Sequence, residues 1–216
     1  MTLATQAKAT PLPLPMPPAL WKATTTPEVV AVPARTVLAL DGQGAPEGQA
    51  FQESIGAIYG VAYTLKFARK KARGGDFKIG PLEARWWTEK PGRNVWDTPR
   101  QTWRWQLRMA IPRDVRAAEL ARTIEDATHK KGGKLEGSPE AARLVLAQLP
   151  TARLGKVLHV GPYATEGESF ARIAAAVKDA GLVARNAHVE VYLSDPRRTK
   201  AEKLKTVLLV EVAEPR

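Results

Sequence analysis

One order of elements, namely strand, strand, helix, strand and strand, occurs twice along the chain and restricts the fold more than any other feature. The first copy spans about residues 27–111 and the second about residues 140–216. Apolar residues spaced three and four apart across 51–65 predict a helix, and alternation from Trp103 to Ile111 predicts a half-buried strand. We therefore expect an α+β fold of duplicated ββαββ units with pseudo-twofold symmetry. Antiparallel sheets would form a central groove, with the helices on the outer face.

The second copy carries the same signals. Its predicted elements are strands over 142–149, 155–160, 187–193 and 205–212, and a helix from about Thr165 to Gly181. The run 142–149 fits a helical turn equally well. A helix over about 114–131 is expected to join the two lobes. We interpret residues 27–216 as one domain of two lobes.

Residues 1–26 differ from the rest in composition. Five prolines interrupt an Ala/Thr-rich stretch that contains no acidic residue. Because this composition disfavours helices and sheet strands, we expect an extended, disordered tail. A transit peptide is the alternative, but such peptides form amphipathic helices rich in arginine, and this segment has no arginine.

The chain has 33 Lys and Arg against 22 Asp and Glu, a formal charge of +11, and no cysteine. Zero cysteines exclude disulfides, thiol nucleophiles and Cys-bound metals, which fits the cytoplasm. No apolar run is long enough to span a bilayer, so no membrane partner is expected. Arg197 and Arg198 fall on a predicted loop without a recognition motif, so nucleic acid is not the expected partner despite the charge.

Two glutamates occupy matching positions of the two copies. In the predicted strand 187–193, Glu190 shares a face with His188 and Tyr192, and the valines between them point to the other face. We expect the valine face to pack on the helix, which would send Glu190 to the opposite side of the sheet. The matching residue of the first copy is Glu83, and superposing the copies puts the two carboxylates opposite each other.

A groove that held both carboxylates would also be lined by aromatic side chains. The candidates are Trp87, Tyr192, Tyr59, Tyr63 and Tyr163. Such a pocket suits a flat organic molecule with positive character, because rings stack and a desolvated carboxylate favours a cation. Burial also raises the pKa of a glutamate toward the range used in general acid–base catalysis. The alternative is that these polar faces meet water, with Glu83 paired to Arg85 or another base.

Other motifs do not support a different chemistry. The stretch DGQGAPEG is similar to a dinucleotide-binding loop, but Gly48 comes one residue late, so we interpret it as a turn. His129, His159 and His188 are scattered singly, which is poor spacing for metal ligands. The sequence contains neither a G-x-S-x-G elbow nor a Walker loop. We therefore expect no metal and no cofactor.

Five stretches resemble the GyrI-like (gyrase-inhibitor-like) small-molecule-binding family. They are HVEVYLSDPRRTKAEKLKTVL, FQESIGAIYGVAYTLKF, PLEARWW, WRWQLRMAIP and HVGPYATEGESFARI, and they cover nearly everything from about Glu28 onward. The resemblance implies the duplicated fold with a ligand groove between the lobes. No helix-turn-helix region precedes the domain, so a stand-alone member is expected and not a transcription regulator.

The resemblance also implies roles for individual residues. The family's pocket glutamate corresponds to Glu190 and its pocket tryptophans to the pair Trp86 and Trp87. Arg85 is a departure, since members more often carry an apolar residue there. With the residue pattern, this gives Glu190, Glu83 and Tyr163 as candidate catalytic residues and Trp86, Trp87, Tyr192, Tyr59, Tyr63 and His188 as candidate ligand-binding residues.

Two functions are compatible with these residues. Some stand-alone members similar to this chain are cyclopropanoid hydrolases, which open the strained ring of DNA-alkylating natural products, and others only bind drugs. We expect binding of an aromatic or cationic small molecule, with hydrolysis of strained electrophiles by a water that Glu190 deprotonates. The alternative is a non-catalytic module that sequesters drugs or binds a protein partner, as a topoisomerase inhibitor does. The sequence leaves the ligand and the oligomeric state open.

Overall fold

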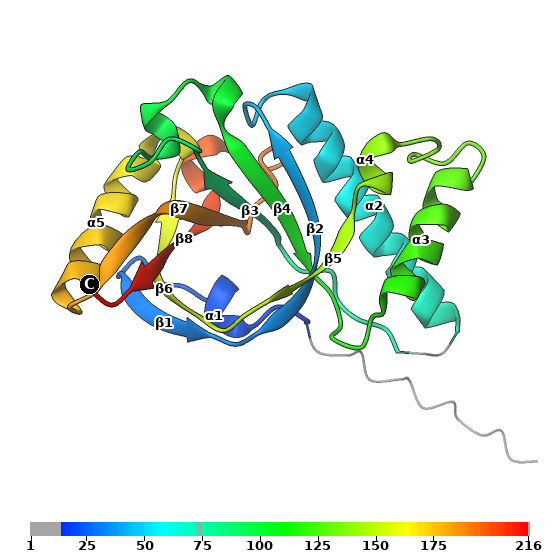
Figure 1. The fold of residues 1–216 in the computed structure, drawn as a ribbon, viewed down its shortest axis with the longest axis horizontal. Coiled ribbons are helices and arrows are strands. Elements are labelled where there is room, and N and C mark those ends of the chain that lie inside the picture. The colour runs from blue at the N-terminus through cyan, green and yellow to red at the C-terminus, as the bar shows by residue number, and fades with distance from the viewer. Residues whose placement is uncertain (1–13, 73–74, 216) are drawn as a thin grey trace, which may run out of the picture.

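The computed structural model describes residues 14–72 and 75–215. Its centre is one curved antiparallel sheet with the strand order β1-β6-β8-β7-β3-β4-β2-β5 (Figure 1). The strands are β1 (Glu28–Val32), β2 (Arg35–Gln43), β3 (Leu82–Trp87), β4 (Arg104–Ala110), β5 (Val145–Leu149), β6 (Ala152–Val160), β7 (Val183–Tyr192) and β8 (Lys205–Ala213). The predicted α+β fold of duplicated units is confirmed.

The strand order has the predicted pseudo-twofold symmetry. Exchanging each strand of one copy for its counterpart, β1 for β5, β2 for β6, β3 for β7 and β4 for β8, gives the same order read backward. The axis therefore passes between β3 and β7 at the centre of the sheet. The two edges are crossed over, because β1 pairs with β6 of the second copy and β5 pairs with β2 of the first.

The two long helices pack on the same face of the sheet. Helix α2 (Gln49–Lys71) covers β2 and β4, and α5 (Glu166–Asp179) covers β6. The predicted apolar stripe of α2 is buried, and Ile173 and Val177 of α5 pack on Leu208 and Val210 of β8. Figure 1 shows α2 and α5 outside the curve of the sheet, with α1 (Pro18–Trp21) inside it.

Residues 14–26 depart from the expected disordered tail, whereas residues 1–13 lie outside the described residues. Met16 and Leu20 are almost fully buried in one apolar cluster with Val189, Val191 and Leu209. The prolines of this segment still allow a single helical turn, because Pro18 is the first residue of α1 and its missing donor is not needed there. The segment covers apolar strand residues that would otherwise be exposed to water.

The remaining elements lie close to their predicted positions. The joining helix is α3 (Ala117–His129), and the ambiguous run is divided between the short helix α4 (Pro139–Ala142) and β5. Among the described residues there are also four short 3-10 helices: η1 (Val95–Asp97), η2 (Arg100–Thr102), η3 (Tyr163–Thr165) and η4 (Ala201–Lys203). None of the helices within residues 14–72 and 75–215 combines the length and the apolarity that crossing a membrane requires.

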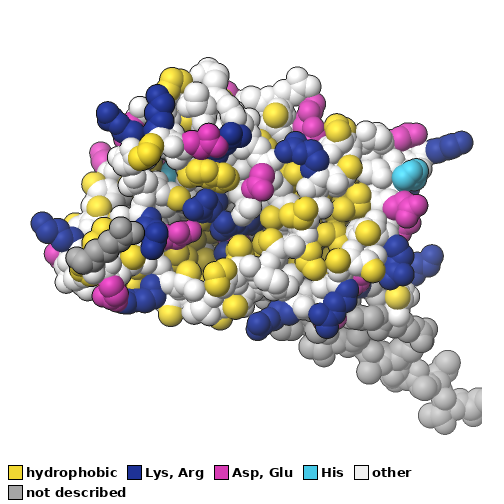
Figure 2. All heavy atoms as spheres, in the orientation of Figure 1, with side chains coloured by type: hydrophobic (Ala, Val, Ile, Leu, Met, Phe, Trp, Pro, Cys, Tyr) yellow, Lys and Arg dark blue, Asp and Glu magenta, His cyan; other side chains and the backbone are white. Residues whose placement is uncertain are grey.

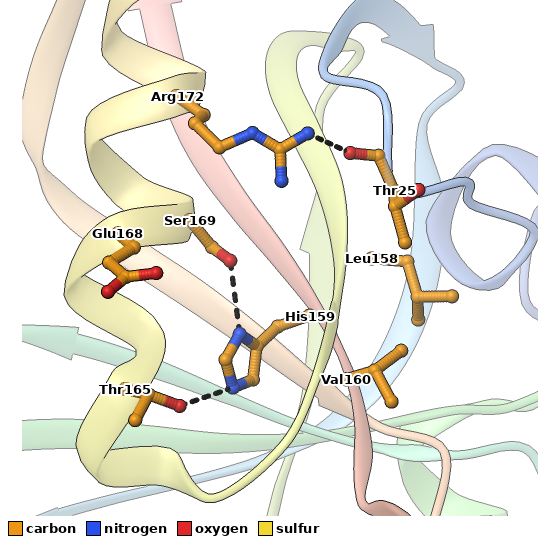
Figure 3. Close-up of a pocket in the computed structure, with 8 residues that line it drawn as sticks. All are labelled: Thr25, Leu158, His159, Val160, Thr165, Glu168, Ser169 and Arg172. Carbon is orange, nitrogen blue, oxygen red and sulfur yellow. Dashed lines mark hydrogen bonds between the residues drawn. The ribbon is translucent and has the colours of Figure 1, made fainter.

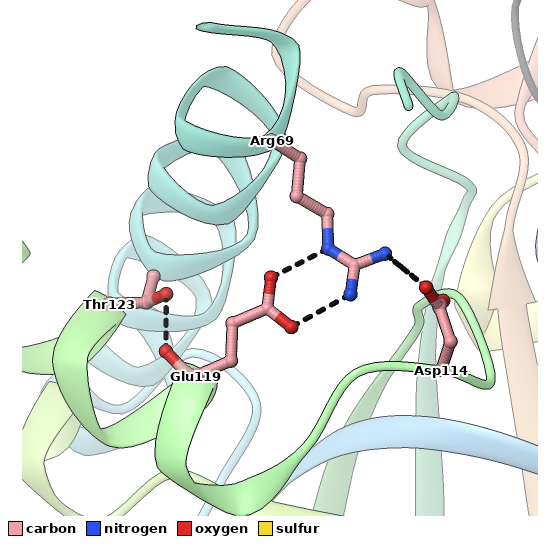
Figure 4. Close-up of polar contacts among 4 residues, drawn as sticks. All are labelled: Arg69, Asp114, Glu119 and Thr123. Atoms are coloured by element: carbon pink, nitrogen blue, oxygen red, sulfur yellow. Dashed lines mark hydrogen bonds and ion pairs between the residues drawn. The ribbon is translucent and has the colours of Figure 1, made fainter. Parts of the chain in front are cut away.

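A buried arginine in the last turn of α2, Arg69, links this helix to α3 through hydrogen bonds (Figure 4). Arg69 Nε and Nη2 each donate to a carboxylate oxygen of Glu119 over 2.7 Å, and Arg69 Nη1 donates to Asp114 Oδ1 over 3.0 Å. Hydrogen bonding to Arg69 lowers the pKa of Glu119, so this pair stays charged at neutral pH. The two-pronged geometry favours arginine over lysine at this position and fixes the angle between the helices.

Candidate functional site

Glu190 lies at the centre of the sheet, on the face that carries α2 and α5. In the β3–β7 pair, Glu190 is opposite Ala84 and His188 is opposite Trp86, so these side chains share one face. Phe170 of α5 contacts His188 with a ring separation of 4.7 Å. The prediction that the valine face of β7 packs on the helix is therefore wrong. The segment around α1 covers that face instead, and α5 covers the face of Glu190.

Both carboxylate oxygens of Glu190 have partners from its own strand. Tyr192 Oη donates to Glu190 Oε2 over 2.7 Å, and His188 Nε2 lies 3.1 Å from Glu190 Oε1. Alternating residues of a strand point the same way, which is why neighbours two positions away in sequence can hold the carboxylate from both sides. Each oxygen keeps a second lone pair with which to accept a proton or contact a ligand.

A second carboxyl group beside Glu190 comes from Glu166, in the first turn of α5. Glu166 is buried, and its Oε1 has no hydrogen-bond partner among the described residues. Burial raises the pKa of Glu166 to about 9, with a further contribution from the negative charge of Glu190. Glu166 therefore carries a proton at neutral pH and can donate it. Sequence reasoning missed this residue, although it lies only three residues after Tyr163, which was itself a candidate site residue.

Two tyrosines add further neutral donors. The rings of Tyr163 and Tyr192 meet edge to face at 6.0 Å. The pKa of Tyr163 is raised to about 12, mainly by burial and to a smaller extent by the negative charges of Glu190 and Glu166. The pKa of Tyr192 is raised well above 10, again mainly by burial. Both phenols stay protonated at neutral pH. We call Tyr163, Glu166, His188, Glu190 and Tyr192 the Glu190 cluster.

Aromatic rings surround the Glu190 cluster. Trp96 lies 5.5 Å from the His188 ring and 5.2 Å from Phe170, and Trp96 and Tyr163 are the exposed members. Trp86 is buried beneath, opposite His188 in the sheet. Trp86 Nε1 and His188 Nδ1 are buried without a hydrogen-bond partner among the described residues. Buried polar atoms normally have partners, so these two atoms are exceptions within the site.

Glu83 and Trp87 lie on the opposite face of the sheet, away from the Glu190 cluster. Glu83 is opposite Val191, and its fully buried carboxylate accepts two hydrogen bonds from Arg35, one of them 2.8 Å long. The shared groove for Glu83 and Glu190 is therefore wrong, because successive β3 residues alternate between faces. The alternative that Glu83 is paired with a base is confirmed, and the base is Arg35.

Two other residues that were expected in the site, Tyr59 and Tyr63, are not members of the Glu190 cluster. Tyr59 is partly buried and packs in the same apolar cluster as Tyr192, and burial raises its pKa. Tyr63 is 43% exposed and stacks between Tyr59 and Phe67 with ring separations of 6.5 and 6.0 Å. Arg85 is not a partner of either candidate glutamate, since it reaches Glu211 at 3.4 Å and stacks on Trp87.

The Glu190 cluster joins one negative carboxylate to neutral proton donors in a mostly buried, ring-lined environment. A carboxyl group that burial keeps protonated, as in Glu166, is suited to act as an acid beside a second carboxyl group that acts as a base. The same carboxylate would also attract a cation held between aromatic rings.

Replacing Glu166 by Gln is expected to reduce the pH dependence of stability. The unfolded chain ionises Glu166 above about pH 4.5, whereas the folded chain keeps its proton until about pH 9, so stability falls as the pH rises through this window. Between pH 5 and pH 8, Glu166 should lower the free energy of unfolding of the wild type by on the order of 4 kcal/mol, and this decrease should be largely absent in the variant. Urea unfolding at both pH values measures it. The control is Glu168→Gln, an exposed residue of the same helix turn, and equal slopes for both variants would contradict the assignment.

The comparison with known proteins gives similarity along most of the chain. An uncharacterized conserved protein from Listeria innocua has 30% sequence identity and a TM-score of 0.78, over 89% of this chain and 95% of that one. A hydrolase from the same bacterium has 28% identity and a TM-score of 0.75, over 89% and 94%. The C-terminal domain of EcmrR shares the fold, with 14% identity and a TM-score of 0.52 over 88% and 98%. No protein-family model and no curated protein matches the chain.

Proposed function

We propose that this chain, which belongs to one family with the uncharacterized conserved protein from Listeria innocua, binds a small organic molecule at the Glu190 cluster and hydrolyses it. The two chains match over nearly the full length of both. The observation that carries the proposal is the buried Glu166, which burial keeps protonated at neutral pH, close to the partly buried carboxyl group of Glu190. The similar hydrolase from the same bacterium supports a reaction with water.

The substrate we propose is an aromatic compound with a strained electrophilic ring, of the cyclopropanoid type implied by the GyrI-like resemblance. The rings of Trp96, Phe170 and Tyr163 supply flat apolar surfaces beside Glu190. The hydroxyl of Tyr163, whose side chain is exposed, supplies a polar contact that would orient a ligand.

In the proposed reaction, Glu190 accepts a proton from water while the water oxygen bonds to a carbon of the strained ring. One carbon–carbon bond of that ring breaks, and its electron pair moves through the conjugated system to a carbonyl oxygen. Glu166 or Tyr163 donates a proton to that oxygen as its negative charge develops. Tyr192 and His188 hold Glu190 in position through the contacts at 2.7 and 3.1 Å.

The test is incubation of the purified protein with a cyclopropane-bearing aromatic alkylating compound in ordinary and in ¹⁸O-labelled water. Mass spectrometry should detect a ring-opened product that is heavier by one oxygen label only in labelled water. Tight binding by calorimetry without product would replace hydrolysis by the alternative of a drug-sequestering module. Neither product nor binding would overturn the proposal for this substrate class.

A further inference from the structure

A separate cavity of about 240 Å³ lies between the first turns of α5 and strand β6 (Figure 3). Four side chains that contribute to its wall are His159 of β6, Thr165 at the end of η3, Ser169 of α5, and Arg172 one turn further along α5. None of the five residues of the Glu190 cluster lines it. Its chemistry is therefore independent of the function proposed above.

A serine and a histidine meet on the wall of this cavity. Ser169 Oγ lies 3.0 Å from His159 Nδ1, and His159 Nε2 lies 3.2 Å from the carbonyl oxygen of Pro162. A carbonyl oxygen only accepts hydrogen bonds, so the neutral ring places its hydrogen on Nε2. Nδ1 is then the bare nitrogen and accepts the hydroxyl hydrogen of Ser169. This is the arrangement in which a histidine acts as general base toward a serine nucleophile.

The Pro162 carbonyl oxygen accepts the hydrogen bond from His159 that a carboxylate accepts in a Ser-His-Asp catalytic triad. The hydroxyl of Thr165 also donates to Pro162 O over 2.9 Å and lies 3.4 Å from His159 Nε2, which fixes this side of the ring. Ser169 and His159 are only 7% and 6% exposed. Water competes weakly at such buried groups, so the hydrogen bond between them is strengthened.

The first copy offers a comparison within the chain. Ser54 stands in the stretch QESI of α2, as Ser169 stands in GESF of α5, and Ser54 is 1% exposed without a hydrogen-bond partner for its hydroxyl. Burial of a serine at this helix position therefore does not require a histidine. The pairing of Ser169 with His159 is a property of the second copy alone.

We propose that Ser169 and His159 form a second reactive site that accepts small activated esters. Ser169 Oγ bonds to the ester carbonyl carbon while its proton moves to His159 Nδ1. The bond from that carbon to the leaving alcohol oxygen breaks, the alcohol takes the proton from His159, and water then releases the acid from Ser169 by the same route. Arg172 holds Thr25 O through Nη2, and its positive charge beside the cavity favours the oxyanion. The volume lies below the usual drug-sized range of about 300–1,000 Å³, which favours short acyl groups such as acetyl.

The experiment treats the full chain with diisopropyl fluorophosphate and follows p-nitrophenyl acetate hydrolysis in parallel. Mass spectrometry of peptides should place one diisopropylphosphoryl group on Ser169, formed as fluoride leaves. Ser169→Ala should remove the label, and His159→Gln should slow labelling by about 10²–10⁴-fold, because it removes the base and keeps the nucleophile. The matched control Ser54→Ala should label as the wild type does.

Thermal unfolding of each variant shows that a lost signal does not reflect a lost fold. Labelling at another residue, or an unchanged rate in folded His159→Gln, would overturn the proposal. Ring opening at the Glu190 cluster should persist in Ser169→Ala, so failure of one site is distinguishable from failure of the other.

Discussion

Replacing Glu190 by Gln is expected to lower kcat for ring opening by about 10²–10⁴-fold, the usual contribution of a positioned general base. The amide has nearly the same shape, and its oxygen can still accept the hydrogen bond from Tyr192. What it cannot do is take a proton from water. The Kd for an aromatic ligand without formal charge should therefore stay close to the wild-type value, and single-turnover kinetics with calorimetry separate the two quantities.

The matched control for this prediction is Glu202→Gln, an exposed residue of η4 outside the Glu190 cluster. It removes the same charge from the chain and should leave both kcat and Kd unchanged. Wild-type turnover in Glu190→Gln would remove Glu190 from the role of base. Loss of binding with unchanged kcat would instead mean that the carboxylate holds the ligand and takes no part in chemistry.

Replacing Glu83 by Gln is expected to lower the free energy of unfolding by about 3–5 kcal/mol, the usual result of removing one partner of a buried ion pair. Glu83 is completely buried and Arg35 is 7% exposed, so the variant leaves an arginine charge in the interior with no carboxylate to balance it. The cost comes mainly from that uncompensated charge. Urea unfolding followed by tryptophan fluorescence gives the difference directly.

A control for this second prediction is Glu47→Gln, because Glu47 pairs with Arg100 and both side chains are exposed. An exposed pair contributes at most about 1 kcal/mol, so this variant should unfold close to the wild type. The double change Arg35→Met with Glu83→Leu should recover most of the stability lost in Glu83→Gln, since well-packed apolar residues often replace buried pairs without penalty. A difference below about 1 kcal/mol for Glu83→Gln would show that Arg35 finds water or another partner.

Much of the fold could be predicted because periodicity reports local structure. The alternation in β4 and the apolar stripe of α2 each fix one element, and the repeated order of elements fixes the symmetry. The face of β7 that meets α5 could not be obtained in this way, because alternation separates two faces without saying what covers each. The covering element for the valine face is the segment around Leu20, which is more than 160 residues away in the sequence.

The candidate site was predictable only in part, for a related reason. Tyr163, His188, Glu190, Tyr192 and Trp86 gather as the residue pattern and the resemblance indicated. Glu166 was overlooked because acidic residues in the first turn of a helix are ordinarily explained by the helix dipole. Glu83 was misplaced because its partner Arg35 lies 48 positions earlier, and no local pattern reports such a pair.

The crossed edge strands also bear on how the chain folds. Glu28 of β1 pairs with Lys156 of β6, and Arg35 of β2 pairs with Leu149 of β5, so both edges close only when residues more than 110 positions apart have met. Such contacts give a high contact order, which slows folding because chain entropy is lost before the contacts form. Neither half completes its sheet alone, so the two halves are expected to form and melt as one cooperative unit. The residues of the Glu190 cluster all come from the second half, whereas Trp86 and Trp96 beside them come from the first, so the complete ring-lined site exists only in the fully assembled state.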